Sequence, residues 1–142
     1  MSRIVVDASI ALAWCFPDET SEYADDILVA LGGHTILVPA IWGLELANAI
    51  LVGQRRKRLN LPEVRSFTSL LENLSIVQDA QLVSDNIRTV LPLAQAHGLS
   101  AYDAAYLELS IRHSARLATL DRALRKAARS SGIELFEGKT VQ

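Results

Sequence analysis

The chain has 142 residues, 50% of them hydrophobic, which is enough for one domain with its own core. Its 14 Lys and Arg against 16 Asp and Glu give a formal net charge of −2. This balance excludes a uniformly basic nucleic-acid-binding surface but allows a local basic rim beside an acidic site. Cys15 is the single cysteine, which excludes an intramolecular disulfide and fits a reducing cytoplasm.

Two apolar stretches bear on membrane insertion. Asp7 interrupts the apolar start of the chain, and residues 36–52 contain Pro39, Glu45 and Asn48, so neither stretch has the pattern of a secretory signal or a membrane span. No repeat or linker composition divides the sequence. We therefore expect a cytoplasmic protein of one domain, residues 1–142, that does not enter a membrane.

Short β-prone runs alternate with longer helical patterns along the chain. The expected strands are residues 4–6, 36–38, 74–77, 117–119 and 133–136. The expected helices are residues 8–15, 21–31, 40–52, 62–71, 84–97, 101–113 and 122–130. Such alternation is typical of an α/β fold with a parallel sheet, and short, wholly apolar runs suit strands that are buried on both faces.

Four acidic residues, far apart in the sequence, fall at equivalent places in this pattern. Asp7 follows the first expected strand and Asp121 follows the fourth, while Glu45 and Asp103 lie early in helices. In such folds the helices run roughly antiparallel to the strands, so their amino ends gather at the carboxyl edge of the sheet. We therefore expect the four carboxylates to lie near one edge.

Most of these acids also have a purely structural interpretation. Asp7 and Asp121 are suitable helix N-caps, and Asp103 stands three residues after Ser100, as in a capping box with a shorter acid. Glu45 is harder to explain in this way, because a carboxylate in so apolar a helix is costly to bury alone. Asn48 is the only other hydrogen-bonding side chain in that segment.

Carboxylates gathered at one edge need a counter-charge. Two carboxylates about 4 Å apart repel by roughly 4 kcal/mol at an effective dielectric constant near 20, so the cluster must bind a cation or be partly protonated. Arg3 and Arg122 are the nearest basic residues in the sequence. An all-oxygen donor set selects Mg²⁺ or Mn²⁺, and one or two such ions can activate water toward a phosphodiester.

The segments that carry these acids also match a known family. They are residues 4–9 (IVVDAS), 39–48 around Glu45, 99–106 (LSAYDAAY) and 117–121 (LATLD). In order and spacing they resemble the four motifs of PIN domains, most closely those of the VapC toxins of type II toxin–antitoxin systems. The resemblance spans residue 4 to about 136.

The resemblance implies a three-layer α/β/α sandwich with a five-stranded parallel sheet. It also implies cleavage of RNA by an endoribonuclease that depends on Mg²⁺ or Mn²⁺. The implied metal-binding and catalytic residues are Asp7, Glu45, Asp103 and Asp121, supported by the hydroxyl groups of Ser9 and Thr119. Similar proteins sometimes carry a further acid after the fourth Asp, and residues 122–126 (RALRK) contain none, which argues against a second metal site.

Family membership would also imply partners. VapC toxins pair with a small antitoxin and usually form homodimers, so the resemblance implies a VapB-like antitoxin, a second copy of the chain and an RNA substrate. Trp14, Phe16 and the aliphatic face of residues 21–31 are candidates for the groove that receives the antitoxin, with core packing as the alternative.

Two basic clusters are candidates for contacts with RNA phosphates. Residues 55–58 (RRKR) follow the Glu45 helix, and a second strip follows Asp121 at helical spacing. The predicted phosphate contacts are Arg55, Arg56, Arg122 and Arg125. The alternative is a solvated surface, with the first cluster near the negative end of a helix dipole.

Two other functions fit parts of the pattern. A catalytically inactive PIN-like module would bind RNA or protein without cleaving, although all four acids are present. A phosphatase of the Asp-x-Asp type would need an acid where Ser9 stands, and a phosphoacceptor domain would need a suitably placed lysine. The sequence therefore favours a metal-dependent endoribonuclease and does not specify its RNA target.

Overall fold

The computed structural model describes residues 2–138. Its centre is a parallel sheet of four strands: β1 (Arg3–Val6), β2 (Thr35–Val38), β3 (Ile76–Gln78) and β4 (Arg116–Ala118). The strand order is β3-β2-β1-β4, with Val5 opposite both Leu37 and Leu117. The predicted α/β class and parallel sheet are thus confirmed.

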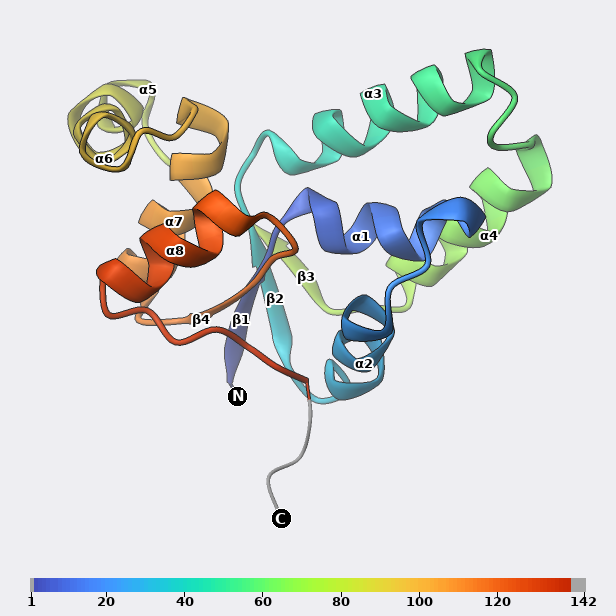
Figure 1. The fold of residues 1–142 in the computed structure, drawn as a ribbon, viewed down its shortest axis with the longest axis horizontal. Helices are drawn as coiled ribbons and strands as arrows, with labels where there is room; N and C mark the ends of the chain where they lie inside the picture. The colour runs from blue at the N-terminus through green and yellow to red at the C-terminus, as the bar shows by residue number, and fades with distance from the viewer. Residues whose placement is uncertain (1, 139–142) are drawn as a thin grey trace.

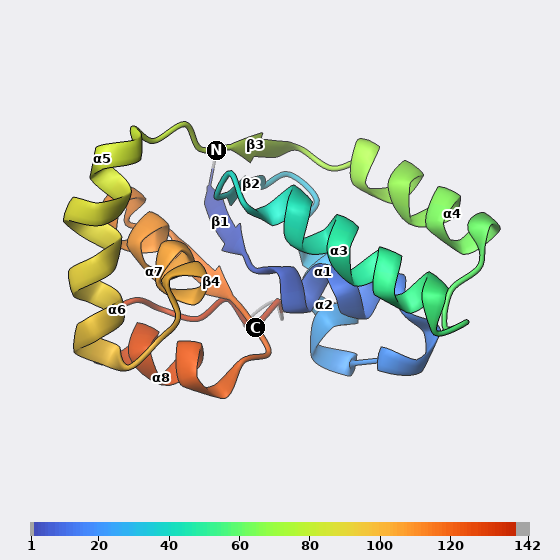
Figure 2. The same ribbon diagram turned by 90° about the horizontal axis from the view of Figure 1, so that it is seen from above.

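Helices lie on both sides of the sheet (Figures 1 and 2). One group comprises α1 (Ala8–Cys15), α2 (Glu22–Ala30), α3 (Trp42–Arg55) and α4 (Leu61–Glu72), with a short 3₁₀ turn at Pro17–Glu19 between α1 and α2. The other comprises α5 (Val83–Asp85), the π-helical turn η2 (Asn86–Val90), α6 (Leu91–His97), α7 (Ala101–His113) and α8 (Arg122–Ser130). Ile4, Val5 and Val6 are completely buried because β1 is covered on both faces.

Local signals fixed several helix boundaries. The predicted helices at residues 8–15, 101–113 and 122–130 are confirmed as α1, α7 and α8. Each begins after a residue whose side chain accepts a hydrogen bond from a free backbone N–H of the first turn: Asp7, Ser100 and Asp121. These three caps hold the amino ends of their helices at defined places.

The predicted fifth strand is wrong. In the described part of the chain, residues 133–136 contribute one isolated parallel bridge, between Leu117 and Leu135, and the sheet has four strands. Two backbone hydrogen bonds, from Leu117 N to Glu134 O and from Phe136 N to Leu117 O, are the bonds on this side of β4. Both bonds involve Leu117 alone, so the pairing with residues 133–136 does not extend along β4.

The helix predicted at residues 84–97 is helical throughout, with α5, η2 and α6 following one another without a break from Val83 to His97, but its middle is a π-helical turn and not a regular α-helix. Pro92 lies in the first turn of α6 and has no backbone N–H. The regular bond from residue 92 to the carbonyl of residue 88 therefore cannot form, and a wider π-helical turn precedes the proline.

Within residues 2–138 no helix combines the length and the apolar character needed to cross a membrane.

Candidate metal centre

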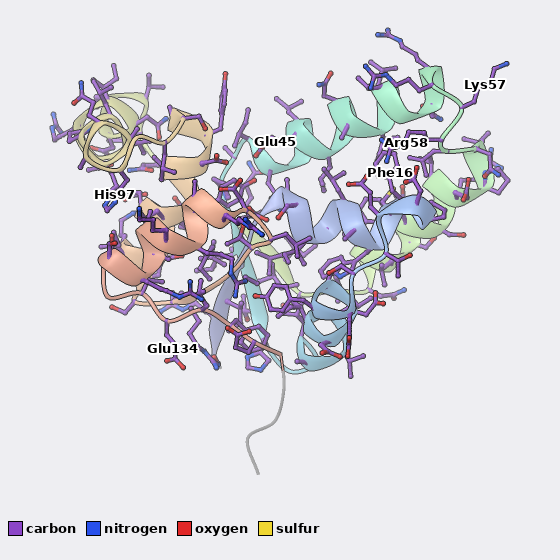
Figure 3. The ribbon with its side chains drawn as sticks, in the orientation of Figure 1. Phe16, Glu45, Lys57, Arg58, His97 and Glu134 are labelled. Carbon is purple, nitrogen blue, oxygen red and sulfur yellow. The ribbon has the colours of Figure 1, made fainter. Side chains whose placement is uncertain are left out.

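Each of the four predicted acids lies at the amino-terminal end of a different helix. Asp7 caps α1 and Asp121 caps α8, while Glu45 and Asp103 are in the first turns of α3 and α7. Figure 1 shows α1 and α3 beginning where β1 and β2 end, and Figure 3 shows Glu45 at the start of α3. The positive ends of the helix dipoles favour carboxylates at these places.

Asp7 is the most buried of the four acids, at 4% exposure. Its Oδ1 accepts hydrogen bonds from the backbone N–H of Ser9 at 2.9 Å and from the Ser9 hydroxyl at 2.5 Å. Its Oδ2 accepts one from the Thr119 hydroxyl at 2.5 Å. Burial raises the pKa of Asp7 to about 6, although these hydrogen bonds pull it down. A carboxylate in this position therefore gains from any cation that approaches it.

Ser9 and Thr119, the predicted supporting residues, join Asp7 to the turn that follows β4. The Ser9 hydroxyl accepts a hydrogen bond from Leu120 N at 3.0 Å, and the Thr119 hydroxyl accepts one from Asp121 N at 3.0 Å. Each hydroxyl thus donates to Asp7 and accepts from the backbone that leads into Asp121. This arrangement fixes the relative position of Asp7 and the start of α8.

Glu45 is half-buried and bonded to α7. Its Oε1 accepts a hydrogen bond from the Tyr106 hydroxyl at 2.5 Å. Burial raises the pKa of Glu45, the bond from Tyr106 lowers it, and the nearby charge of Asp103 raises it. The sequence offered Asn48 as the only polar neighbour in the same helix, but Asn48 is exposed and the partner comes from another element.

Electrostatic coupling joins the remaining acids to the same site. Burial raises the pKa of Asp103, and the charge of Asp121 raises it further. Burial raises the pKa of Tyr106 most, its hydrogen bond to Glu45 raises it further, and the charges of Glu45 and Asp7 add to the shift. A chain of neighbours therefore runs from Asp121 through Asp103 to Glu45, and Tyr106 connects Glu45 with Asp7.

The donor chemistry of this group fits a hard divalent cation. All the candidate ligands are carboxylate oxygens, and their mutual charges disfavour full ionisation without a counter-ion. Among residues 2–138, however, no three His, Cys, Asp or Glu side chains already lie close enough together to hold a metal ion. Asp103 is the electrostatic neighbour of both Glu45 and Asp121, while Asp7 is joined to the start of α8 through Ser9 and Thr119. The roles of the four acids as metal ligands and catalytic residues stay a prediction.

The two predicted basic clusters lie at different distances from the acids. Arg55 and Arg56 are at the carboxyl end of α3, about 15 Å along the helix axis from Glu45 at 1.5 Å per residue. Figure 3 shows the separation between Glu45 and Lys57, the next residue of this cluster. The structure therefore does not bring this cluster to the acids.

Arg122 and Arg125 are close to the site, since both lie in the first turn of α8 after Asp121. Arg122 is exposed. Arg125 donates to the carbonyl of Thr119 at 2.9 Å, and its guanidinium lies 5.1 Å from the centre of the Tyr23 ring. Arg125 thus holds the turn that carries Thr119 and Asp121, while contacts of either residue with RNA stay a prediction.

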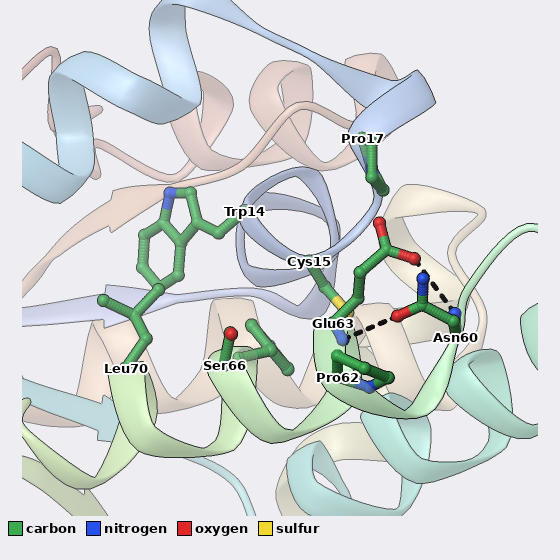
Figure 4. A pocket seen from close by; sticks show the side chains of 9 residues that line it. Trp14, Cys15, Pro17, Asn60, Pro62, Glu63, Ser66 and Leu70 are labelled. Atoms are coloured by element: carbon green, nitrogen blue, oxygen red, sulfur yellow. Dashed lines mark hydrogen bonds between the residues drawn. The ribbon is translucent and has the colours of Figure 1, made fainter.

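The residues expected to receive an antitoxin surround two neighbouring hollows. One, of about 480 Å³, lies between the end of α1 and α4 and is lined by Trp14, Cys15 and Leu70 among others (Figure 4). The other, of about 290 Å³, includes Trp14, Phe16 and Leu28. Trp14 also donates through Nε1 to the carbonyl of Ala24, so part of its role is to dock α2.

A third hollow lies beside the acids. It measures about 570 Å³ and is mostly apolar, with walls from the start of α3, from η2 and α6, and from the start of α7. Leu44 and Tyr102 line it and are adjacent in sequence to Glu45 and Asp103. Both are well exposed, at 68% and 61%.

Comparison with known proteins places this architecture in a family. The chain matches the PIN domain over residues 4–130. It is 32% identical over 123 residues to "Ribonuclease VapC3" of Pyrobaculum aerophilum, a match that covers 86% of this chain and 92% of that protein.

Two solved structures are similar in fold. The crystal structure of PAE2754 from P. aerophilum has a TM-score of 0.65 and 24% identity, covering 89% of this chain and 79% of that one. The crystal structure of VapBC2 from Rickettsia felis, bound to a DNA fragment from its promoter, has a TM-score of 0.66 and 15% identity, covering 94% and 97%. With its α/β fold and with family motifs over most of its length, the chain belongs to the PIN-domain family.

Proposed function

We propose that the protein is an endoribonuclease that depends on Mg²⁺ or Mn²⁺ and acts as the toxin of a toxin–antitoxin pair. The observation that carries the proposal is the set of four acids at the amino ends of four helices, coupled through Tyr106, Ser9 and Thr119. The relationship to a protein named as a ribonuclease supports the same conclusion.

The chain's own residues would prepare the site in two ways. Asp7, Glu45, Asp103 and Asp121 would hold the ion, which when bound neutralises the acids and polarises a phosphodiester for attack by water. Ser9 and Thr119 would hold both oxygens of Asp7 in place, so that this carboxylate does not reorient during the reaction. Arg122, exposed beside Asp121, would attract the RNA backbone.

The decisive experiment measures RNA cleavage by the purified chain. We expect cleavage with Mg²⁺ or Mn²⁺ and none after addition of EDTA. Asp7→Asn and Asp103→Asn should each lower the rate by more than about 100-fold, because losing even an outer partner of a metal ligand commonly costs about 10- to 100-fold. Both variants should keep the circular dichroism spectrum of the wild type.

A matched control is Asp85→Asn, which removes an acid from α5 that is paired with Arg88. This variant should cleave RNA at the wild-type rate. Full activity of both Asp7→Asn and Asp103→Asn, or cleavage that persists in EDTA, would contradict the proposal.

The proposed partners are a VapB-like antitoxin and a second copy of the chain. The hollows around Trp14 support the first, because an apolar segment of a partner could enter them beside α1 and α4 (Figure 4). Sedimentation of the chain alone tests the homodimer. Co-expression with the antitoxin tests the pair, which should copurify and should no longer cleave RNA.

A second candidate function is a PIN-like module that binds RNA or protein without cleaving it. The absence, among the described residues, of three acids already within metal-binding reach favours this alternative. Isothermal titration separates the two functions, because the inactive module would show no Mn²⁺ binding at millimolar ion.

A further inference from the structure

The Tyr106 hydroxyl is a buried polar group to which the sequence alone assigned no role, although Tyr106 ends the third motif segment, residues 99–106. Tyr106 is 1% exposed, and its hydroxyl lies 2.5 Å from Glu45 Oε1. The two residues are 61 positions apart and belong to α7 and α3. A buried phenol needs a hydrogen-bond partner, and here its partner is one of the four acids.

The geometry of α7 explains why this phenol reaches the site. Tyr106 follows Asp103 by three residues, so both side chains leave the same face of the helix. One helix therefore delivers to Glu45 both a repelling charge, from Asp103, and a hydrogen-bond donor, from Tyr106. The long side chain of Glu45 would otherwise be free to swing away from Asp103 toward solvent.

We propose that Tyr106 is a positioning residue that holds the Glu45 carboxylate on the side of Asp103, where the metal ion would bind. This inference rests on the proposed function, because Tyr106 would act through Glu45, one of the proposed metal ligands. The phenol donates to Oε1 of Glu45, so the other carboxylate oxygen would remain available as a metal ligand. The hydrogen bond thus preorganises an acid that its own helix cannot hold.

The first test is Tyr106→Phe, which keeps the buried ring and removes only the hydroxyl. Isothermal titration of the metal-free protein with Mn²⁺ should give an affinity about 10- to 100-fold weaker than that of the wild type. The Mn²⁺ concentration for half-maximal cleavage should rise by the same factor, and the rate should recover at saturating Mn²⁺. A general loss of folded protein would instead lower the rate at every Mn²⁺ concentration.

The matched control is Thr68→Val, in α4, a helix that carries none of the four acids. The Thr68 hydroxyl donates to the backbone carbonyl of Val64 at 2.8 Å, within the same helix. Losing it also removes one hydroxyl donor, so Mn²⁺ affinity should stay at the wild-type value.

A second measurement needs neither metal nor activity. The chain contains three tyrosines, so ¹³Cζ-labelled tyrosine gives three resonances, and Tyr106→Phe identifies one of them. In metal-free protein, Glu45→Gln should shift the Tyr106 resonance, because a phenol bonded to a carboxylate differs from one bonded to an amide. The Tyr23 resonance, identified with Tyr23→Phe, should not move, because the Tyr23 hydroxyl donates to the carbonyl of Phe136.

The outcomes separate the two proposals. Wild-type protein that binds no Mn²⁺ overturns the nuclease proposal and the role of Tyr106 with it. Wild-type binding with equal affinity in Tyr106→Phe overturns the role of Tyr106 alone, as does a Tyr106 resonance that Glu45→Gln leaves unmoved. Weaker binding in Tyr106→Phe, with unchanged binding in Thr68→Val, supports it.

Discussion

Asp7 combines a structural and a functional task in one side chain. As the N-cap of α1 it accepts bonds from backbone N–H groups, and as a buried carboxylate it carries a pKa raised by desolvation. An asparagine would satisfy the cap without the buried charge. The buried charge of Asp7 therefore destabilises the folded chain when no ion is bound, and binding of a cation would remove this destabilisation.

We expect Asp7→Asn to stabilise the metal-free protein at neutral pH. The folded-state pKa is raised from 3.8 to about 6, so the folded protein holds a proton that the unfolded chain releases between these values. Wild-type stability therefore falls as the pH rises through this window, and the deficit is complete above it. Asp7→Asn should gain about 2 kcal/mol at pH 7.5, allowing for altered hydrogen bonds.

Urea unfolding in EDTA at pH 4 and at pH 7.5 measures this effect. The advantage of Asp7→Asn should be confined to the higher pH, since near pH 4 the wild-type carboxyl is already largely protonated in the folded state. A variant that is less stable than wild type at both values would show that the hydrogen bonds outweigh the buried charge.

At the scale of elements, the approach of α3 to the end of α1 depends on Gly53. A Cβ atom at this position would lie 2.5 and 2.7 Å from two ring carbons of Phe16, which is 3% exposed and covered by the Arg58 guanidinium (Figure 3). Alanine favours a helix more than glycine does. At position 53 it is nevertheless excluded, because its Cβ would collide with the Phe16 ring.

Gly53→Ala should lower the free energy of unfolding by about 2 kcal/mol, because the buried ring has little room to move. Gly43→Ala is the matched control in the same helix, since a Cβ there meets nothing within 4 Å. It should gain about 0.5 kcal/mol from helix propensity. Equal effects of the two substitutions in urea unfolding would show that the Phe16 contact is unimportant.

Across the whole molecule, an ion-pair cluster ties the end of β3 to α7. Arg112 makes a bidentate pair with Asp79, with distances of 2.6 and 3.1 Å, and a further pair with Glu108 at 2.8 Å. The hydrogen bonds from Arg112 lower the pKa of Asp79. This ion-pair cluster connects the carboxyl end of β3, a three-residue strand at the edge of the sheet, to α7.

Asp79→Asn should lower the free energy of unfolding by about 1 kcal/mol at pH 7, a discounted value because the pair is partly exposed. A lowered folded-state pKa means that the stabilisation is present above the unfolded pKa and is lost as the pH falls through the folded one. The difference from wild type should therefore shrink on acidification. Asp85→Asn, which breaks the exposed pair with Arg88, should change stability by less than about 0.5 kcal/mol.

The sequence by itself determined the helix starts at Asp7, Ser100 and Asp121, the parallel α/β class and the grouping of four acids at helix amino ends. These follow from local caps and from the alternation of elements, which depend on neighbouring residues. It also marked Ser9 and Thr119 as partners of the acidic site, through their places in the family motifs.

Only the tertiary structure decided which side chain supports Glu45, whether residues 133–136 form a strand, and which arginines lie near the acids. Tyr106 meets Glu45 across 61 residues, and Arg55 lies at the far end of α3 from Glu45. Such relations depend on how helices cross and how long each strand is. No local pattern encodes them, because the bonds that satisfy buried groups are chosen when distant segments pack together.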